Sequence, residues 1–194
     1  MMAIVFTAFF LLGSVQAVRF LLPEKSPVVR IWLGLALGLL LEMQLPALFA
    51  YAFGFTAAAH VAATAAMLAV VTVCFFLRDR RPLRPMCPSD RRLLAMMAVI
   101  CLPLTALSGY LQYTHVLMPA ADGSLWCGQS TYGDLCMHLS FVTSIEGMDF
   151  PPRYSLLAGT PLSYPYLTDS LSTSLYMLGL PLSWKKPENH GVHV

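Results

Sequence analysis

Side chains able to do acid–base chemistry gather in one part of this sequence, between residues 133 and 169. Asp134 and His138 stand four positions apart there. Positions i and i+4 share one face of a helix, so this carboxylate and imidazole can form a general base with its partner, or half of a metal site. The alternative is an aspartate at a helix start beside an unrelated histidine. Which of the two interpretations is favoured depends on the structural elements that surround the pair.

The rest of the chain has the composition of a membrane protein. Hydrophobic residues make up 57% of it and charged residues 11%, against roughly 25% charged in soluble domains. Apolar runs longer than about 18 residues predict membrane spans. We therefore predict an all-α, polytopic transmembrane protein with four to five membrane helices. Its formal net charge of +2 is too small to indicate nucleic acid as a partner.

Residues 1–114 are predicted to form the transmembrane region. Its four spans are expected at 1–22, 28–53, 54–77 and 93–113. The loop between the last two, residues 78–92, carries six arginines and is cytoplasmic under the positive-inside rule. Each span reverses the side, so the N-terminus and residues 115–169 are predicted to be extracytoplasmic.

The extracytoplasmic loop 115–169 is predicted to contain a short amphipathic helix over residues 134–145. Leu135, Leu139 and Val142 would share its apolar face, and Asp134 would stand in its first turn, where the helix dipole favours a carboxylate. A fifth, partial membrane helix is expected over residues 170–184 and a polar tail over 185–194. Cys127 and Cys136 are nine positions apart in this part of the chain. They either form a disulfide or remain two free thiols.

Glu42 lies in the middle of the second predicted span. A lone carboxylate inside a membrane is costly, and a functional role is the default hypothesis for it. We favour the alternative, a hydrogen-bonded packing residue beside a kink at Pro46.

The residues around Asp134 and His138 resemble the GT-C superfamily of polytopic membrane glycosyltransferases, in particular poorly characterised bacterial members. The resemblance is carried by Gly133-Asp134-Leu135, His138-Leu139, Ser144-Ile145, Phe150-Pro151-Pro152, Ala158-Gly159, Leu162, Tyr164, Tyr166-Leu167 and Asp169. It implies transfer of a sugar from a polyprenyl-phosphate-linked donor at the extracytoplasmic face of the cell inner (plasma) membrane. Membrane lipid and this donor are the partners it implies.

The resemblance also implies roles for individual residues. An acidic residue in the first large outer loop activates the acceptor or helps to hold a divalent metal, and by position this residue is Asp134. His138 would orient Asp134 or contact the donor phosphate. The departing phosphate already has a low pKa, so it needs stabilisation of its negative charge more than it needs a proton. No residue is assigned as a metal ligand, and the cofactor is left open.

Four further residues are predicted to bind substrate. Arg153 is the nearest cation suited to hold a phosphate through two parallel hydrogen bonds. Tyr164 and Tyr166 would stack on a sugar, or alternatively lie at the level of the lipid headgroups. Asp169 is either a second acidic member of the site or a carboxylate that merely begins a helix.

GT-C enzymes generally have more membrane helices, so the resemblance implies that this chain is the N-terminal fragment of a larger enzyme. The main alternative is a non-enzymatic integral membrane protein, an accessory subunit or transporter for envelope polysaccharide, in which Glu42 and the loop bind a ligand. A third interpretation is an unassembled fragment, in which Glu42 and the Ser/Thr-rich face of the last helix lack partners.

Overall fold

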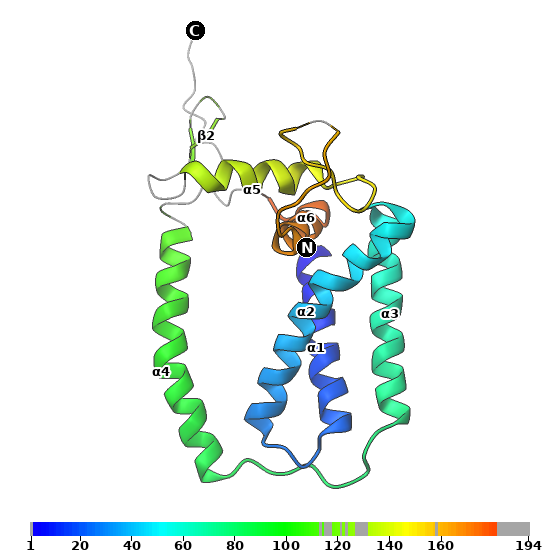
Figure 1. Ribbon diagram of the computed structural model, residues 1–194. Helices are drawn as coiled ribbons and strands as arrows, with labels where there is room; N and C mark the ends of the chain where they lie inside the picture. The colour runs from blue at the N-terminus through cyan, green and yellow to red at the C-terminus, as the bar shows by residue number, and fades with distance from the viewer. Residues whose placement is uncertain are drawn as a thin grey trace.

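The protein is seen in a computed structural model that describes residues 2–112, 114, 118–120, 122, 124–126, 132–157 and 159–181. Six helices and one short antiparallel strand pair form within these residues (Figure 1). The helices are α1 (Met2–Leu21), α2 (Pro27–Phe53), α3 (Ala57–Phe76), α4 (Pro88–Leu111), α5 (Tyr132–Ser144) and α6 (Leu167–Met177). The strands are β1 (Met118–Pro119) and β2 (Leu125–Trp126).

Four of these helices, α1 to α4, are long and apolar enough to cross a membrane. They have 20, 27, 20 and 24 residues, and at 1.5 Å per residue about 20 residues span a hydrocarbon core of about 30 Å. The predicted all-α polytopic fold is confirmed. Helix α6 has 11 residues and is too short to span; residues 182–194 of the expected fifth helix and tail lie outside the described part.

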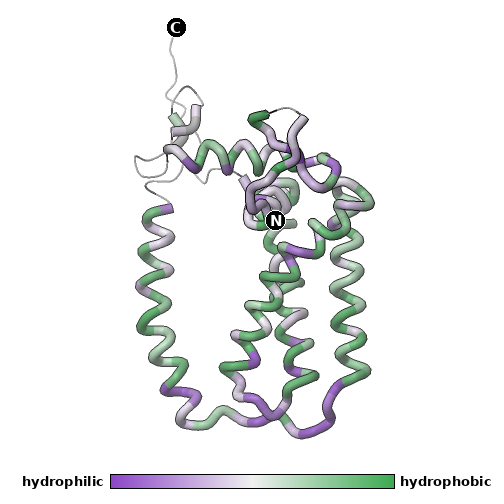
Figure 2. The backbone as a smooth tube through the Cα atoms, viewed as in Figure 1, coloured by the Kyte–Doolittle hydropathy of each residue, from purple (hydrophilic) through white to green (hydrophobic). Residues whose placement is uncertain are grey.

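The spanning helices alternate in direction, so different segments of the chain lie at the two ends of the bundle. Helices α5 and α6 lie at the same end as the N-terminus, where the backbone N–H of Ala3 donates to the carbonyl of Leu178 (3.2 Å; Figure 1). The arginine-rich loop lies at the opposite end, visible as a hydrophilic band in Figure 2. The segment with the candidate site and the basic loop therefore lie on opposite sides of the bundle.

Helices α1 and α2 pack at backbone distance. A Cβ placed on Gly34 would lie 2.5 Å from the Cα of Val15, and one on Gly38 would lie 2.8 Å from the Cα of Leu11. Glycines four apart on one helix face let two membrane helices approach this closely. No larger side chain fits either position without moving the α1 backbone.

Glu42 lies one turn beyond Gly38 on the same face of α2. It is 1% exposed, and its Oε1 accepts a hydrogen bond from the Thr7 hydroxyl at 2.6 Å. Its Oε2 has no hydrogen-bond partner in the described chain. Pro46, one turn further, is also buried. Glu42 is thus a hydrogen-bonded packing residue between α1 and α2.

Helix α4 begins at Pro88, five residues before the predicted start at Leu93. Asp90 accepts a hydrogen bond from the backbone N–H of Cys87 (3.1 Å), which closes the first turn, and proline is favoured at a first helical position. The charged residues Asp90, Arg91 and Arg92 are therefore helical. The spanning part of α4 is not buried against any other described element.

The close approach of α1 and α2 makes Gly34 and Gly38 sensitive to added volume. We expect Gly34→Ala and Gly38→Ala each to lower the free energy of unfolding by about 1–3 kcal/mol, because a backbone must shift to admit the methyl group. The measurement is reversible unfolding of the protein in detergent.

The matched control is Gly109→Ala on α4, where a Cβ would meet nothing within 4 Å. Equal unfolding curves for Gly34→Ala and Gly109→Ala would contradict the close-packing account.

Candidate functional site

Helix α5 forms almost where the sequence predicts it, over Tyr132–Ser144 instead of 134–145, with Asp134 in its first turn. Its best-buried side chains are Phe141 and Val142, and Ile145, which directly follows the helix, is also buried. Of the predicted apolar face, Val142 is buried, whereas Leu135 and Leu139 are half-buried. The face is rotated because the core against which α5 packs lies at the turn between α2 and α3, around Phe55.

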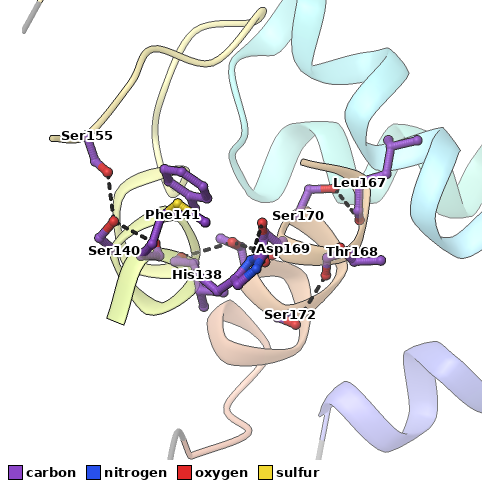
Figure 3. Close-up of polar contacts among 12 residues, drawn as sticks. His138, Ser140, Phe141, Ser155, Leu167, Thr168, Asp169, Ser170 and Ser172 are labelled. Atoms are coloured by element: carbon purple, nitrogen blue, oxygen red, sulfur yellow. Dashed lines mark hydrogen bonds and ion pairs between the residues drawn. The ribbon is translucent and has the colours of Figure 1, made fainter. Parts of the chain in front are cut away.

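His138 of α5 and Asp169 of α6 form the one histidine–carboxylate ion pair among the described residues. The Nδ1 of His138 lies 2.9 Å from Oδ1 and 3.1 Å from Oδ2 of Asp169 (Figure 3). The Asp169 side chain is 7% exposed and that of His138 32%, so the pair is sheltered on one side and open on the other. The structure thus joins two of the predicted site residues across 31 positions of sequence.

The pairing of His138 with Asp134, which the four-residue spacing suggests, is not seen. Asp134 is exposed, and its side chain makes no hydrogen bond or ion pair within the described chain. His138 bonds to Asp169 because α6 packs beside α5 and presents a buried carboxylate to it, while Asp134 remains in contact with solvent.

Burial controls the electrostatics of this pair. Desolvation raises the pKa of Asp169 above its ordinary value, and the hydrogen bond and charge of His138 offset part of the rise. Asp169 also stands in the first turn of α6, where the helix dipole favours a negative charge. It therefore both begins a helix and belongs to the candidate site.

The polar face of α6 has partners within the described chain. The hydroxyl of Thr173 lies 2.9 Å from the carbonyls of both Val142 and Asp169, and that of Ser174 lies 2.9 Å from Nε2 of His60. The expectation that this face lacks partners is wrong for these residues. The reason is that α6 lies across the end of the bundle, where α5 and α3 both reach it.

His60 is the residue of this region whose role the sequence does not reveal. Its Nδ1 lies 2.7 Å from the carbonyl of Thr56, which can only accept, so Nδ1 carries a proton. Its Nε2 contacts Ser174, which is 114 positions away in the sequence. No local pattern indicates such a contact, and from the sequence His60 is interpreted as a packing or interfacial residue and not as a ligand.

Tyr164 lies beside the pair, its ring centroid 5.6 Å from that of His138 at an angle of 71°. Tyr164, Tyr166 and Tyr51 line a pocket of about 390 Å³ next to it, together with Gln44, Ala47, Leu48, Pro165, Leu167 and Thr168. Burial, and then the hydrogen bond with Tyr51, raises the pKa of Tyr166 to about 12. Tyr166 therefore presents a neutral hydroxyl at physiological pH.

Arg153 is placed near this end of the bundle but not in the pair. It is exposed, its backbone bridges to Pro161, and its guanidinium makes no ion pair in the described chain. Within the described ranges, no group of three or more His, Cys, Asp or Glu residues could hold a metal ion. Cys127 lies outside those ranges, so the choice between a Cys127–Cys136 disulfide and two thiols stays a prediction.

A scan against protein families, a search of curated proteins and a search of solved structures each found no match to this chain. The fold and composition define its class, a multi-pass α-helical membrane protein.

The offsetting effect of His138 on Asp169 has a measurable sign. In His138→Leu the hydrogen bond and the charge that lower the pKa of Asp169 are lost while the volume is filled. We therefore expect this pKa to rise further, so that Asp169 stays protonated to higher pH. Carboxyl ¹³C NMR of aspartate-labelled protein measures it.

Tyr164→Phe is the control, because it leaves the His138–Asp169 contact in place. An unchanged or lower pKa of Asp169 in His138→Leu would show that the pair is not formed.

Proposed function

We propose that this protein is a GT-C-like membrane glycosyltransferase, or the N-terminal part of one. It would transfer a sugar from a polyprenyl-phosphate-linked donor at the extracytoplasmic face of a cell inner membrane. The resemblance of residues 133–169 supports the reaction class. The observation that carries the proposal is the contact of His138 with Asp169, which joins two residues of that motif in one half-sheltered site.

The distribution of charge supports the orientation. Every described lysine and arginine except Arg153 lies at or beside the end that carries the basic loop. The opposite end carries Asp134, Glu146, Asp149 and Asp169. Basic loops remain on the cytoplasmic side of a membrane, so α5 and α6 would face outward, where a lipid-linked sugar is used.

The geometry suits His138 as the general base. Asp169 accepts the Nδ1–H, which fixes the tautomer and leaves Nε2 without a hydrogen-bond partner in the described chain. The acceptor hydroxyl would give its proton to Nε2 as its oxygen bonds to the anomeric carbon of the sugar. The bond from that carbon to the phosphate oxygen breaks, and polyprenyl phosphate leaves as an anion. Asp169 stabilises the imidazolium that forms.

Asp134 and Arg153 keep supporting roles in this proposal. Both are exposed, Asp134 in the first turn of α5 and Arg153 in the segment that follows α5. Asp134 would help to hold the acceptor, and Arg153 would hold the donor phosphate. Tyr164 and Tyr166 would form one wall of the sugar subsite, because both line the pocket and the ring of Tyr164 also lies against His138.

A second candidate is a non-enzymatic subunit or transporter for envelope polysaccharide. It is favoured by the same contact, since His138 and Asp169 also tie α5 to α6 and would do so in a protein without chemistry. The two candidates differ in whether Nε2 of His138 accepts a proton during sugar transfer.

Replacing His138 and Asp169 in the source cell distinguishes the two candidate functions. We expect His138→Asn and Asp169→Asn to lower sugar transfer by about 10²–10⁴-fold, the usual contribution of a positioned base, while the protein remains at its normal membrane level. Asp134→Asn should also lower transfer. Labelled sugar incorporated into envelope glycan is the activity, and immunoblotting gives the membrane level.

The control is Thr143→Ala, an exposed position on α5. Normal transfer by His138→Asn at a normal membrane level would remove the enzyme proposal, and normal transfer by Asp134→Asn would remove that residue from the mechanism.

The tyrosine wall gives a separate expectation. Tyr164→Ala should raise KM for the donor by about 3- to 10-fold, the equivalent of one aromatic contact. Tyr164→Phe should not, because stacking on a sugar requires the ring and not the hydroxyl. Equal KM values for the two variants would place the sugar elsewhere.

A further inference from the structure

The end of the bundle opposite the candidate site carries a dense group of exposed cations. Six of them have no carboxylate partner in the described chain: Arg19, Lys25, Arg78, Arg80, Arg91 and Arg92, here called the basic face. The acidic residues nearby are engaged elsewhere. Asp79 pairs with Arg81, and Asp90 lies 3.6 Å from Arg84.

The backbone beneath the basic face is fixed. The loop between α3 and α4 has no helix or strand, yet the backbone N–H groups of Asp79 and Arg84 donate to the carbonyls of Phe20 and Pro23, both at 2.9 Å. These bonds hold the loop against the turn between α1 and α2. The backbone that carries Arg78 and Arg80 is therefore held in place before a ligand binds.

Arg30 adds a charge inside this surface. It is 7% exposed, and its guanidinium donates to the carbonyls of Pro23 and Arg84, both at 3.2 Å. No carboxylate neutralises it within the described residues. A buried cation bonded only to carbonyls leaves a net positive field at the surface above it.

The apolar surroundings of the basic face determine which class of anion can bind there. The basic face lies at the ends of all four spanning helices, and the spanning part of α4 beside it is uncovered by other described elements. A partner here must combine a negative headgroup with hydrocarbon that covers α4. We propose that the basic face binds anionic phospholipid, with the phosphate on the arginines and the acyl chains along α4.

The proposal does not depend on the glycosyltransferase activity. It is tested with the purified 194-residue chain in neutral detergent, by native mass spectrometry with dioleoyl phosphatidylglycerol and, in parallel, dioleoyl phosphatidylcholine. Phosphatidylglycerol should bind more tightly. In the variant Arg80→Gln, Arg91→Gln, Arg92→Gln its affinity should fall on the order of 100-fold, because each cation contributes about fivefold.

Arg153→Gln is the matched control, an exposed arginine at the opposite end, and should bind phosphatidylglycerol as the wild type does. Raising NaCl from about 0.05 M to about 0.5 M should weaken phosphatidylglycerol binding to the wild type, a result that does not depend on the folding of any variant.

Equal affinity for the two lipids, or full affinity in the triple variant, would overturn the proposal. Displacement of bound phosphatidylglycerol by an RNA homopolymer at lower concentration than free lipid would overturn it in favour of a nucleic-acid surface.

Discussion

The absence of water inside a lipid bilayer is the constraint on which this structure depends. Backbone groups in the hydrocarbon region must be paired within the chain, which requires α1 to α4 to be continuous helices. A hydrogen-bond partner also lowers the cost of a polar side chain within a span. Glu42 has such a partner in Thr7, in an interface made tight by glycines. Most other ionisable residues lie at the ends of the bundle, the candidate site at one end and the basic face at the other.

The candidate site is positioned by the turn between α2 and α3. Gly54 has a φ of +64°, a conformation that favours glycine, and sends the chain directly from one helix toward the next. Phe55 follows it, and its backbone N–H and carbonyl bond to Met148 and Gly147 at 2.8 and 2.9 Å. Its ring stacks on Phe150 at 5.3 Å. This turn therefore anchors the segment that follows α5, and α5 carries His138.

A second set of contacts anchors α6. Thr173 bonds to the carbonyl of Val142 on α5, and Ser174 bonds to His60 on α3. Both contacts are buried, so they are protected from competition by water. Asp169 is thus held on a helix fixed from two sides, and its carboxylate can orient His138 without first being ordered itself.

The sequence predicts those parts of the structure that depend on local pattern. Apolar run length locates the spans to within a few residues, and the pattern around Leu139 locates α5. The start of α4 is missed because arginines in its first turns look like a loop. The pairing of His138 is missed because spacing within one helix shows Asp134 and cannot show Asp169, whose position depends on how α6 packs.

The central claim is that His138 and Asp169 act as one functional unit. A double-mutant cycle on sugar transfer in source-cell membranes, using His138→Asn, Asp169→Asn and the double variant at matched membrane levels, tests it most directly. The account predicts that the double variant loses no more activity than the worse single variant, because either change disables the same base. Losses that multiply, or single variants that transfer sugar normally, would contradict it.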